Sequence, residues 1–262
     1  MMSRGWFRQE HQGFVFYRCP EFNNDRLIQA VSTRSCGNLA LHTGDQPGQV
    51  VARRTKVLEA LGLHMERLVA AVQTHGTGIR VIDNAAAGAG ALDYGTALPD
   101  TDGLITATPG LILAIFTADC LPVFIYDPKT PAIGLVHAGW RGTLHGIVPK
   151  ALDEMNRAFG SIAAHCWVAL GPGICSNCFQ VSPDLAAKFA ARRPQSVLCD
   201  QAGSKFRVDL VHYNQWLLEQ AGIRPERIIP SGFCTVCESG DFYSYRAEQG
   251  TNGRIISLLA LA

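Results

Sequence analysis

Four apolar strand candidates follow one another between residues 103 and 137, and no helical pattern interrupts them. The candidate at residues 111–116 (LILAIF) is apolar at every position, which is typical of a strand in a sheet that is covered on both faces. Doubly wound folds alternate strands with helices along the chain, and this run breaks that alternation. The sequence therefore predicts an α+β fold, a layered domain built on mixed sheets.

Four helices are predicted outside this run from capping residues and apolar spacing. The first is typical, because Asp45 and Pro47 precede its apolar residues and Gly62 follows them. A stretch of alanine and glycine at residues 85–91 is predicted to be a mobile loop. The helices are expected at residues 50–61, 142–159 with a kink at Pro149, 182–193 and 210–221, and further strands at 14–17, 68–72, 166–170, 242–245 and 254–259.

Length and composition restrict the class of protein. With 262 residues, of which 47% are hydrophobic, the chain is expected to form one domain over residues 1–262, with the polar residues 1–12 flexible. Its 23 basic and 22 acidic residues nearly balance, and no basic run exceeds Arg53-Arg54, so nucleic acid is not an expected partner. No apolar run approaches the ~18 residues that a membrane span needs. Residues 1–12 lack the apolar stretch of a signal peptide, and nine cysteines fit reduced thiols, so we expect a cytoplasmic protein; its oligomeric state is not indicated.

Three potential metal ligands each follow a predicted strand. His75 comes after residues 68–72, Cys120 after residues 111–116, and His137 directly after residues 132–136. Side chains just past strand ends meet at one rim of a sheet. Two imidazoles and one thiolate suit zinc with its fourth position open, which is the arrangement of a catalytic site. The sequence therefore predicts an enzyme with one catalytic zinc ion bound by these three residues.

The segment that begins at His137 (HAGWRG) has the features of an anion site. Gly139 and Gly142 allow the backbone to pass close to a ligand, Arg141 offers a planar set of donors, and a helix is predicted to begin here. A helix-capping turn with Trp140 packed in the core is the alternative interpretation.

Four motifs carry a resemblance to a known family. Residues 73–76 (QTHG), 117–123 (TADCLPV), 137–142 (HAGWRG) and 171–174 (GPGI) resemble the laccase-domain family, once labelled multicopper polyphenol oxidases. The likeness covers nearly the whole chain. Members of that family are zinc-dependent purine nucleoside phosphorylases that also act as adenosine deaminase and methylthioadenosine phosphorylase. The resemblance implies a layered α/β sandwich with two mixed β-sheets flanked by helices, and it places the family's zinc ligands on His75, Cys120 and His137.

The implied activity is zinc-dependent phosphorolysis of adenosine, inosine, guanosine and methylthioadenosine, with deamination of adenosine as a side activity. Its partners would be purine nucleosides and phosphate. Cys120 and His137 are the expected catalytic residues, and Arg54 and Arg141 are the expected substrate-binding residues. Arg54 belongs to the family's Asn-Arg pair, of which the asparagine is replaced by Arg53 here.

Two further residues are candidates for the active site. Asp119 is the nearest candidate for a proton shuttle, with a turn residue that accepts backbone N–H groups as its alternative. Arg246 follows an aromatic stripe and is a weaker candidate for the same site.

Two alternative enzymes use the same residues. A metal-free cysteine hydrolase would need only Cys120 as nucleophile and His137 as base. A copper-dependent phenol oxidase would need many histidines and, for a blue-copper centre, a nearby methionine. The chain has no His-x-His pair, and its four methionines lie at positions 1, 2, 65 and 155, so copper is disfavoured.

Two Cys-x-x-Cys pairs allow an interpretation from another functional class, that of a structural zinc protein. Residues 175–178 and 234–237 resemble the halves of a structural zinc ribbon or redox-sensitive pairs. However, residues 179–233 separate them, whereas zinc ribbons usually have ~15–20 residues between the pairs. A second metal at these four cysteines therefore stays an open alternative.

Overall fold

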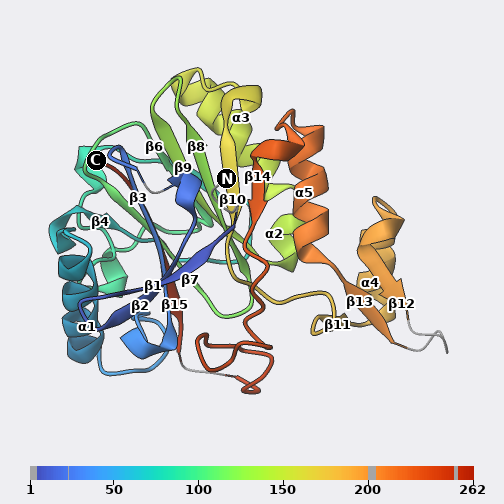
Figure 1. Cartoon of the computed structure of the whole chain (residues 1–262), viewed down its shortest axis with the longest axis horizontal. Coiled ribbons are helices and arrows are strands. Elements are labelled where there is room, and N and C mark those ends of the chain that lie inside the picture. Colours follow the sequence, from blue (N-terminus) through green and yellow to red (C-terminus); the bar gives the residue numbers. More distant parts are fainter. Residues whose placement is uncertain (1–4, 23, 200–204, 251–252) are drawn as a thin grey trace.

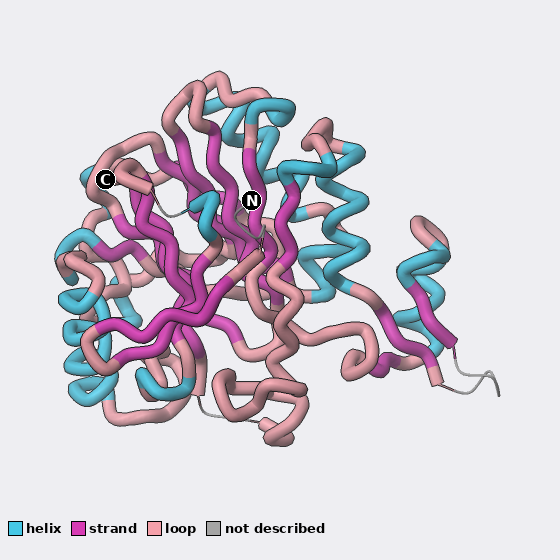
Figure 2. Tube along the Cα trace, viewed as in Figure 1, coloured by secondary structure: helices cyan, strands magenta, loops and turns pink. Residues whose placement is uncertain are grey.

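The computed structural model describes residues 5–22, 24–199, 205–250 and 253–262. Within these, two six-stranded sheets form the body of the molecule, and a three-stranded sheet lies to one side of it (Figures 1 and 2). The first sheet has the order β1-β2-β3-β15-β7-β4 and consists of Phe7–His11, Phe14–Arg18, Leu27–Ser32, Ile255–Leu261, Ile112–Thr117 and Leu68–Val69. The second has the order β14-β10-β8-β9-β6-β5 and consists of Ile228–Pro230, Trp167–Leu170, Leu121–Asp127, Ala132–Ala138, Gly103–Thr106 and Ile79–Val81. The small sheet has the order β11-β13-β12 and consists of Gln180–Val181, Phe206–Val208 and Val197–Cys199.

Both large sheets are mixed, as predicted. In the first, β4 pairs in parallel with β7, while β15 runs antiparallel to β3 and β7. In the second, β14 and β5 are the parallel edge strands, and β8, β9 and β6 form an antiparallel centre. The run at residues 103–137 accordingly contains β6, β7, β8 and β9 with no helix between them, but its strands belong to two different sheets.

In the described part of the chain, five α-helices accompany the sheets: α1 (Pro47–Ala60), α2 (Trp140–Leu144), α3 (Ile147–Phe159), α4 (Pro183–Ala190) and α5 (Leu210–Gln220). Helix α1 covers the outer face of the first sheet, and α2, α3 and α5 cover the outer face of the second (Figure 1). Helix α4 packs on the small sheet. None of the described helices has both the length and the apolar character that crossing a bilayer requires.

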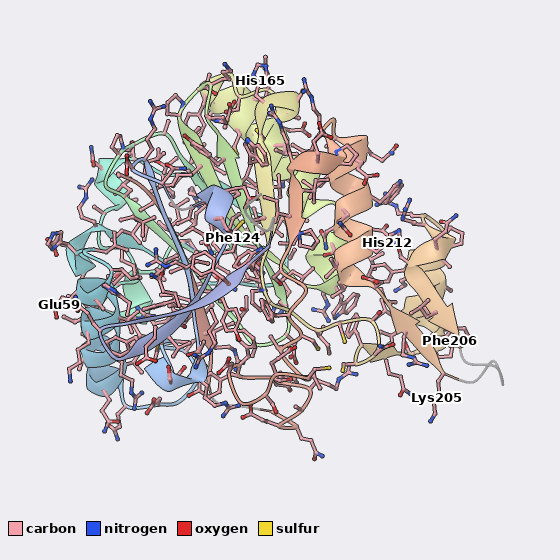
Figure 3. All side chains as sticks on the ribbon, viewed as in Figure 1. Glu59, Phe124, His165, Lys205, Phe206 and His212 are labelled. Atoms are coloured by element: carbon pink, nitrogen blue, oxygen red, sulfur yellow. The ribbon has the colours of Figure 1, made fainter. Side chains whose placement is uncertain are left out.

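The apolar strands are buried on both faces because the two large sheets pack on each other as well as on helices. Along β8, Phe124 and Tyr126 point into the core between the sheets, while Val123 and Ile125 point toward α3 and α5. Figure 3 shows Phe124 in this interior and Glu59, on the last turn of α1, at the periphery. Successive side chains along a strand therefore pack in different hydrophobic cores. The molecule is a helix–sheet–sheet–helix sandwich with three such cores.

Several predicted elements differ from the structure. The helix expected at 142–159 is interrupted at Gly146, which has a left-handed backbone with φ of 73°, and so divides into α2 and α3. Pro149 lies in the first turn of α3, where its missing N–H breaks no helical hydrogen bond, so the predicted kink is wrong. The segment expected as a strand at 242–245 forms bends and turns instead.

Two segments that were expected to be flexible are held by hydrogen bonds. Residues 7–11 form β1 and pair along their whole length with β2; residues 1–4 lie outside the described part of the chain. In the stretch at residues 85–91, the Ala89 carbonyl accepts from Ala70 N at 2.8 Å, and the side chain of Arg54 donates to the carbonyls of Gly90 and Ala91. That stretch is therefore a packed loop beside α1.

Candidate metal centre and active site

His75, Cys120 and His137 converge as predicted. One ligand atom from each lies within 4.8 Å of the others, and the two imidazole rings are 4.8 Å apart between centroids at an angle of 76°. His75 lies in the loop after β4, and Cys120 in the turn between β7 and β8. His137 lies inside β9, opposite Pro122 of β8, and not past the end of a strand as the sequence predicted. The β8–β9 pairing fixes the positions of the last two ligands relative to each other.

Asp102 holds two of the three ligands and was missed as a site residue. Its carboxylate is fully buried, and Oδ1 lies 2.8 Å from His137 Nδ1. The same oxygen accepts a hydrogen bond from His75 N at 3.0 Å, and Oδ2 accepts from Gly76 N at 2.7 Å. A carboxylate on Nδ1 directs the other ring nitrogen, Nε2, toward a metal. The signal in the sequence was its position directly before an apolar strand candidate; the pairing of that strand, β6, with β9, which carries His137, is seen only in the structure.

Backbone geometry at the site is unusual. His75 and Asp119 have positive φ angles, 60° and 89°, in a region that L-residues seldom adopt without support from their surroundings. Gly139 leaves room for the ligands: a Cβ atom there would lie 3.1 Å from both Cys120 Sγ and His75 Cδ2. The fold therefore brings the ligand side chains together at a cost in backbone strain and with no spare space.

Cys120 and His137 also perturb each other electrostatically. Burial acts to raise the pKa of the Cys120 thiol, but the charge on His137 and hydrogen bonds from His137 and His75 outweigh it and lower the pKa to about 6. Burial acts to lower the pKa of His137, but the Cys120 thiolate and Asp102 outweigh it and raise that pKa to about 9. Cys120 is therefore available as a thiolate, the form that binds metals and acts as a nucleophile.

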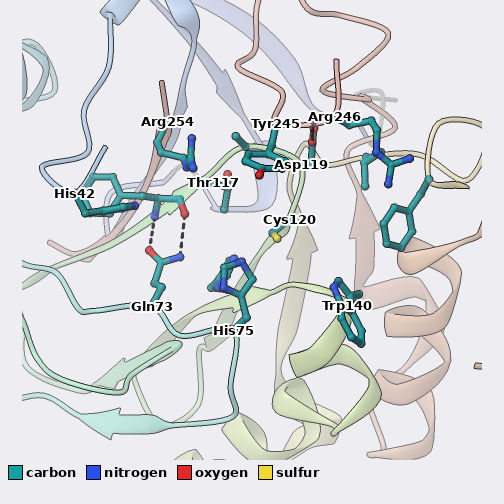
Figure 4. A pocket seen from close by; sticks show the side chains of 15 residues that line it. His42, Gln73, His75, Thr117, Asp119, Cys120, Trp140, Tyr245, Arg246 and Arg254 are labelled. Atoms are coloured by element: carbon teal, nitrogen blue, oxygen red, sulfur yellow. Dashed lines mark hydrogen bonds between the residues drawn. The ribbon is translucent and has the colours of Figure 1, made fainter. Parts of the chain in front are cut away.

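A cavity of about 550 Å³ opens beside these ligands (Figure 4). Gln73 forms part of its floor, with its amide bonded to the backbone N and O of Phe116 at 2.8 and 2.9 Å. Thr117 also lines the cavity; its buried Oγ1 has no hydrogen-bond partner within the described residues. The wall further includes His42, Trp140, Ile174, Phe179, Tyr245, Arg246 and Arg254.

Neither arginine predicted to bind substrate lines this cavity. Arg54 is buried behind Phe116, with its guanidinium 4.6 Å from that ring and bonded to the carbonyls of Leu39, Gly90 and Ala91. Arg141 is exposed on α2, with its guanidinium 5.1 Å from the ring of Trp140.

Two other arginines, Arg246 and Arg254, line the cavity. Both come from the C-terminal part of the chain, one from the turn after residues 242–245 and one beside β15. Positive charge thus reaches the cavity from the wall opposite α2.

Asp119 has the structural role that was the alternative interpretation. Its Oδ1 accepts from Thr235 Oγ1 and its Oδ2 from Arg246 N, both at 2.7 Å. Both oxygens are therefore used to hold the turn that carries Arg246 against the turn that carries Cys120. Trp140, expected either at an anion site or in the core, is partly buried at the start of α2 and lines the cavity.

The chain is similar to proteins of one known family. Residues 29–262 match the family model described as multi-copper polyphenol oxidoreductase laccase. The chain belongs to this family. Among laccase-family relatives, purine nucleoside phosphorylase YlmD of Bacillus subtilis is 31% identical over 91% of this chain and 90% of its own. Adenosine deaminase RL5, from an unknown prokaryotic organism, is 31% identical over 83% of this chain and 84% of its own.

A solved structure within the laccase family has the same fold. YlmD from Geobacillus stearothermophilus superposes with a TM-score of 0.90 at 31% identity, covering 97% of this chain and 98% of that one. The predicted family and its layered fold with two mixed sheets are thereby confirmed, and the small third sheet is an addition that the sequence did not indicate.

Proposed function

We propose that this chain is a zinc-dependent purine nucleoside phosphorylase with adenosine deaminase side activity. The observation that carries the proposal is the position of His75. A pair made of Cys120 and His137 would suffice for a hydrolase, yet His75 is held in a strained conformation by Asp102 so that its ring faces the same point. Strain of this kind persists where the surrounding structure enforces it, and a third ligand at a metal site explains why it is kept.

The donor set fits zinc. Two imidazole nitrogens and one thiolate lie within 4.8 Å of one another, and Asp102 orients His137 in the way that carboxylates orient metal-bound histidines. The family model's description mentions copper, but a blue-copper centre with this donor set has a weak axial ligand, usually methionine, and neither of the methionines that the structure describes, Met65 and Met155, lines the cavity. Bound at these three ligands, zinc would supply Lewis-acid activation of the nucleophile, which is phosphate in phosphorolysis and water in deamination.

The cavity fits a nucleoside and an anion. Its volume of about 550 Å³ lies in the range of small-molecule sites, and its wall combines aromatic faces with charged and polar groups. Trp140, Phe179 and Tyr245 offer surfaces on which a purine can stack. Arg246 and Arg254, which line the cavity, are the proposed phosphate-binding residues in the role that the sequence assigned to Arg54 and Arg141; Arg246 also donates to the carbonyl oxygens of Cys178 and Gln180.

A metal-free cysteine hydrolase remains a second candidate because one observation favours it. Cys120, His137 and Asp102 form a nucleophile, a base and an orienting carboxylate in the order of a catalytic triad, with the thiol pKa lowered to about 6. This enzyme would act without phosphate and would keep its activity in a chelator.

The two candidates are separated by one set of measurements. Zinc content is determined on tag-free protein, and adenosine and inosine are assayed with and without phosphate. The phosphorylase releases free base only with phosphate, and His75→Ala loses one zinc ion and at least 100-fold in turnover, while His64→Ala, at an exposed histidine, keeps both. Full activity of zinc-depleted protein would refute the proposal.

A further inference from the structure

A second group of potential metal ligands lies beside the cavity. The Sγ atoms of Cys175, Cys178, Cys234 and Cys237, here called the four-cysteine cluster, all lie within 4.8 Å of one another. All four are free thiols, and Sγ of Cys178 and Sγ of Cys237 are 3.6 Å apart. No residue of this cluster belongs to the His75 site.

The fold explains why cysteines so far apart in sequence meet. Strands β10 and β14 are parallel neighbours, and the chain continues side by side past their ends. Ser231 N donates to Leu170 O, Gly173 N donates to Phe233 O, and Thr235 N donates to Gly173 O. The two Cys-x-x-Cys pairs therefore begin side by side, just beyond the ends of their two strands. The intervening residues form the small sheet, α4 and α5, so the long separation in sequence is no objection to a shared site.

The arrangement of the sulfur atoms fits a tetrahedral metal. Zinc–sulfur bonds of about 2.3 Å place the corners of a regular tetrahedron about 3.8 Å apart. The separation of 3.6 Å between Cys178 Sγ and Cys237 Sγ and the upper limit of 4.8 Å for every pair of sulfur atoms lie on either side of that value. In addition, Cys175 N lies 3.3 Å from Cys234 Sγ and donates a hydrogen bond to it. Backbone N–H groups directed at sulfur stabilise thiolates in metal sites.

We propose that the four-cysteine cluster binds a second, structural Zn²⁺ ion. Each thiol gives up its proton to become a ligand, so four thiolates and one Zn²⁺ form a site with two negative charges and no open position. A positive charge lies close by, because the Arg246 guanidinium donates to the carbonyl oxygens of Cys178 and Gln180 at 3.0 and 3.1 Å. This site therefore serves the fold and takes no part in the reaction.

The second ion stabilises one wall of the active-site cavity. Ile174 and Phe179, which line the cavity, flank the first cysteine pair in the chain. Thr235, inside the second pair, donates to Asp119 next to the catalytic ligand Cys120. Zinc at the cluster thus ties together the loops after β10 and β14, the Cys120 turn and the turn that carries Arg246.

The test is metal analysis of the intact protein, and it does not depend on turnover. We expect two zinc ions per chain in the wild type, one in His75→Ala and one in the double variant C178A/C237A. Cys166→Ala, at a free thiol outside the cluster, should keep two. X-ray absorption of His75→Ala, in which the cluster is untouched, should show four sulfur neighbours at about 2.3 Å.

Three results would overturn the proposal. These are His75→Ala protein without zinc, a zinc spectrum in that variant with fewer than four sulfur neighbours, and disulfides among the four cysteines in mass spectra of freshly purified protein. Because the readout is made in His75→Ala, failure of the second site is distinct from failure of the proposed function, which would appear as unchanged turnover in the same variant.

Discussion

At the scale of single residues, Asp102 determines the geometry of the candidate metal centre. Its two oxygens accept from the backbone of residues 74–76 and contact the ring of His137, so one buried carboxylate sets both the loop and the imidazole. The His137 hydrogen bond and charge hold the pKa of Asp102 below its usual value, although burial alone acts to raise it. The carboxylate therefore stays ionised while fully buried.

Asp102→Asn is expected to weaken zinc binding at the His75 site about 10- to 100-fold, the usual effect of removing a carboxylate that orients a metal-bound histidine. An amide has a single acceptor oxygen and cannot replace all of these contacts. Competition with a chelator of known affinity measures the change. Asp100→Asn, at an exposed carboxylate two residues away, is the matched control. Equal zinc affinity in both variants would contradict the role given to Asp102.

The three candidate ligands could be predicted at this scale, and so could Arg246, which was a weaker candidate for the same site and lines the cavity, but Arg254 could not. His75 and Cys120 were identified because a ligand type just past an apolar strand is visible in the sequence. Arg54 does not line the cavity, because its guanidinium donates to the carbonyls of residues 39, 90 and 91, contacts that exist only after the chain has folded. Arg254 reaches the cavity from the other end of the chain and had no local signal.

At the scale of elements, the β8–β9 hairpin is the frame of the candidate site. One end carries Cys120 and His137, and the other end is a turn organised by Asp127. The buried Asp127 carboxylate accepts from Lys129 N at 2.8 Å, from Thr130 Oγ1 at 2.7 Å and from Ile162 N at 3.3 Å. Burial acts to raise the pKa of Asp127, but these hydrogen bonds outweigh it and hold the pKa below its usual value.

Asp127→Asn should therefore lower the free energy of unfolding by about 1–3 kcal/mol at neutral pH. A carboxyl group whose folded pKa is depressed stabilises the fold above its unfolded pKa and loses that contribution as the pH falls through the folded value. The difference between variant and wild type should accordingly shrink below about pH 4. Urea unfolding at several pH values measures it, with the exposed Asp93→Asn as the control. A difference that does not change with pH would refute this assignment.

Helix starts were easier to predict than the connections between strands. Ser182 and Asp209 cap α4 and α5 through their side chains, as local sequence indicated. The break before α3 was missed because Gly146 adopts a left-handed conformation that interrupts an otherwise helical pattern. The pairing of β10 with β14 was also invisible, and with it the meeting of the two cysteine pairs.

At the scale of the whole molecule, one apolar layer joins the two large sheets. Phe124 is fully buried there, with ring centroids 5.8 Å from Trp6 and 6.4 Å from Phe22. These partners come from the N-terminal part of the chain, so the contact joins distant segments as well as two sheets. The sandwich depends on such residues more than on any single strand pair.

Phe124→Ala should lower the free energy of unfolding by about 3–5 kcal/mol, because it leaves a cavity between the sheets that neither can close alone. Denaturant unfolding measures the loss, and the exposed Val81→Ala should change stability by no more than about 0.5 kcal/mol. A loss below about 1 kcal/mol would mean that the sheets are held together elsewhere.

The layered fold itself could be predicted because continuous apolar strands need cover on two faces. Which strands share a sheet could not be predicted, since β7 and β8 are neighbours in sequence and members of different sheets. Only long-range pairing, such as that of β15 with β3 and β7, decides this assignment.

The cavity has two sides of different construction. One side is made by paired strands and their turns, which carry the candidate metal ligands, and the other by turns at residues 242–250, where Tyr245 and Arg246 lie. A side-chain substitution at Tyr245 or Arg246 would reshape this side of the cavity, while the backbone hydrogen bond from Arg246 N to Asp119, beside Cys120, could still form. Engineering of what the cavity accepts can therefore address these turns separately from the candidate ligands.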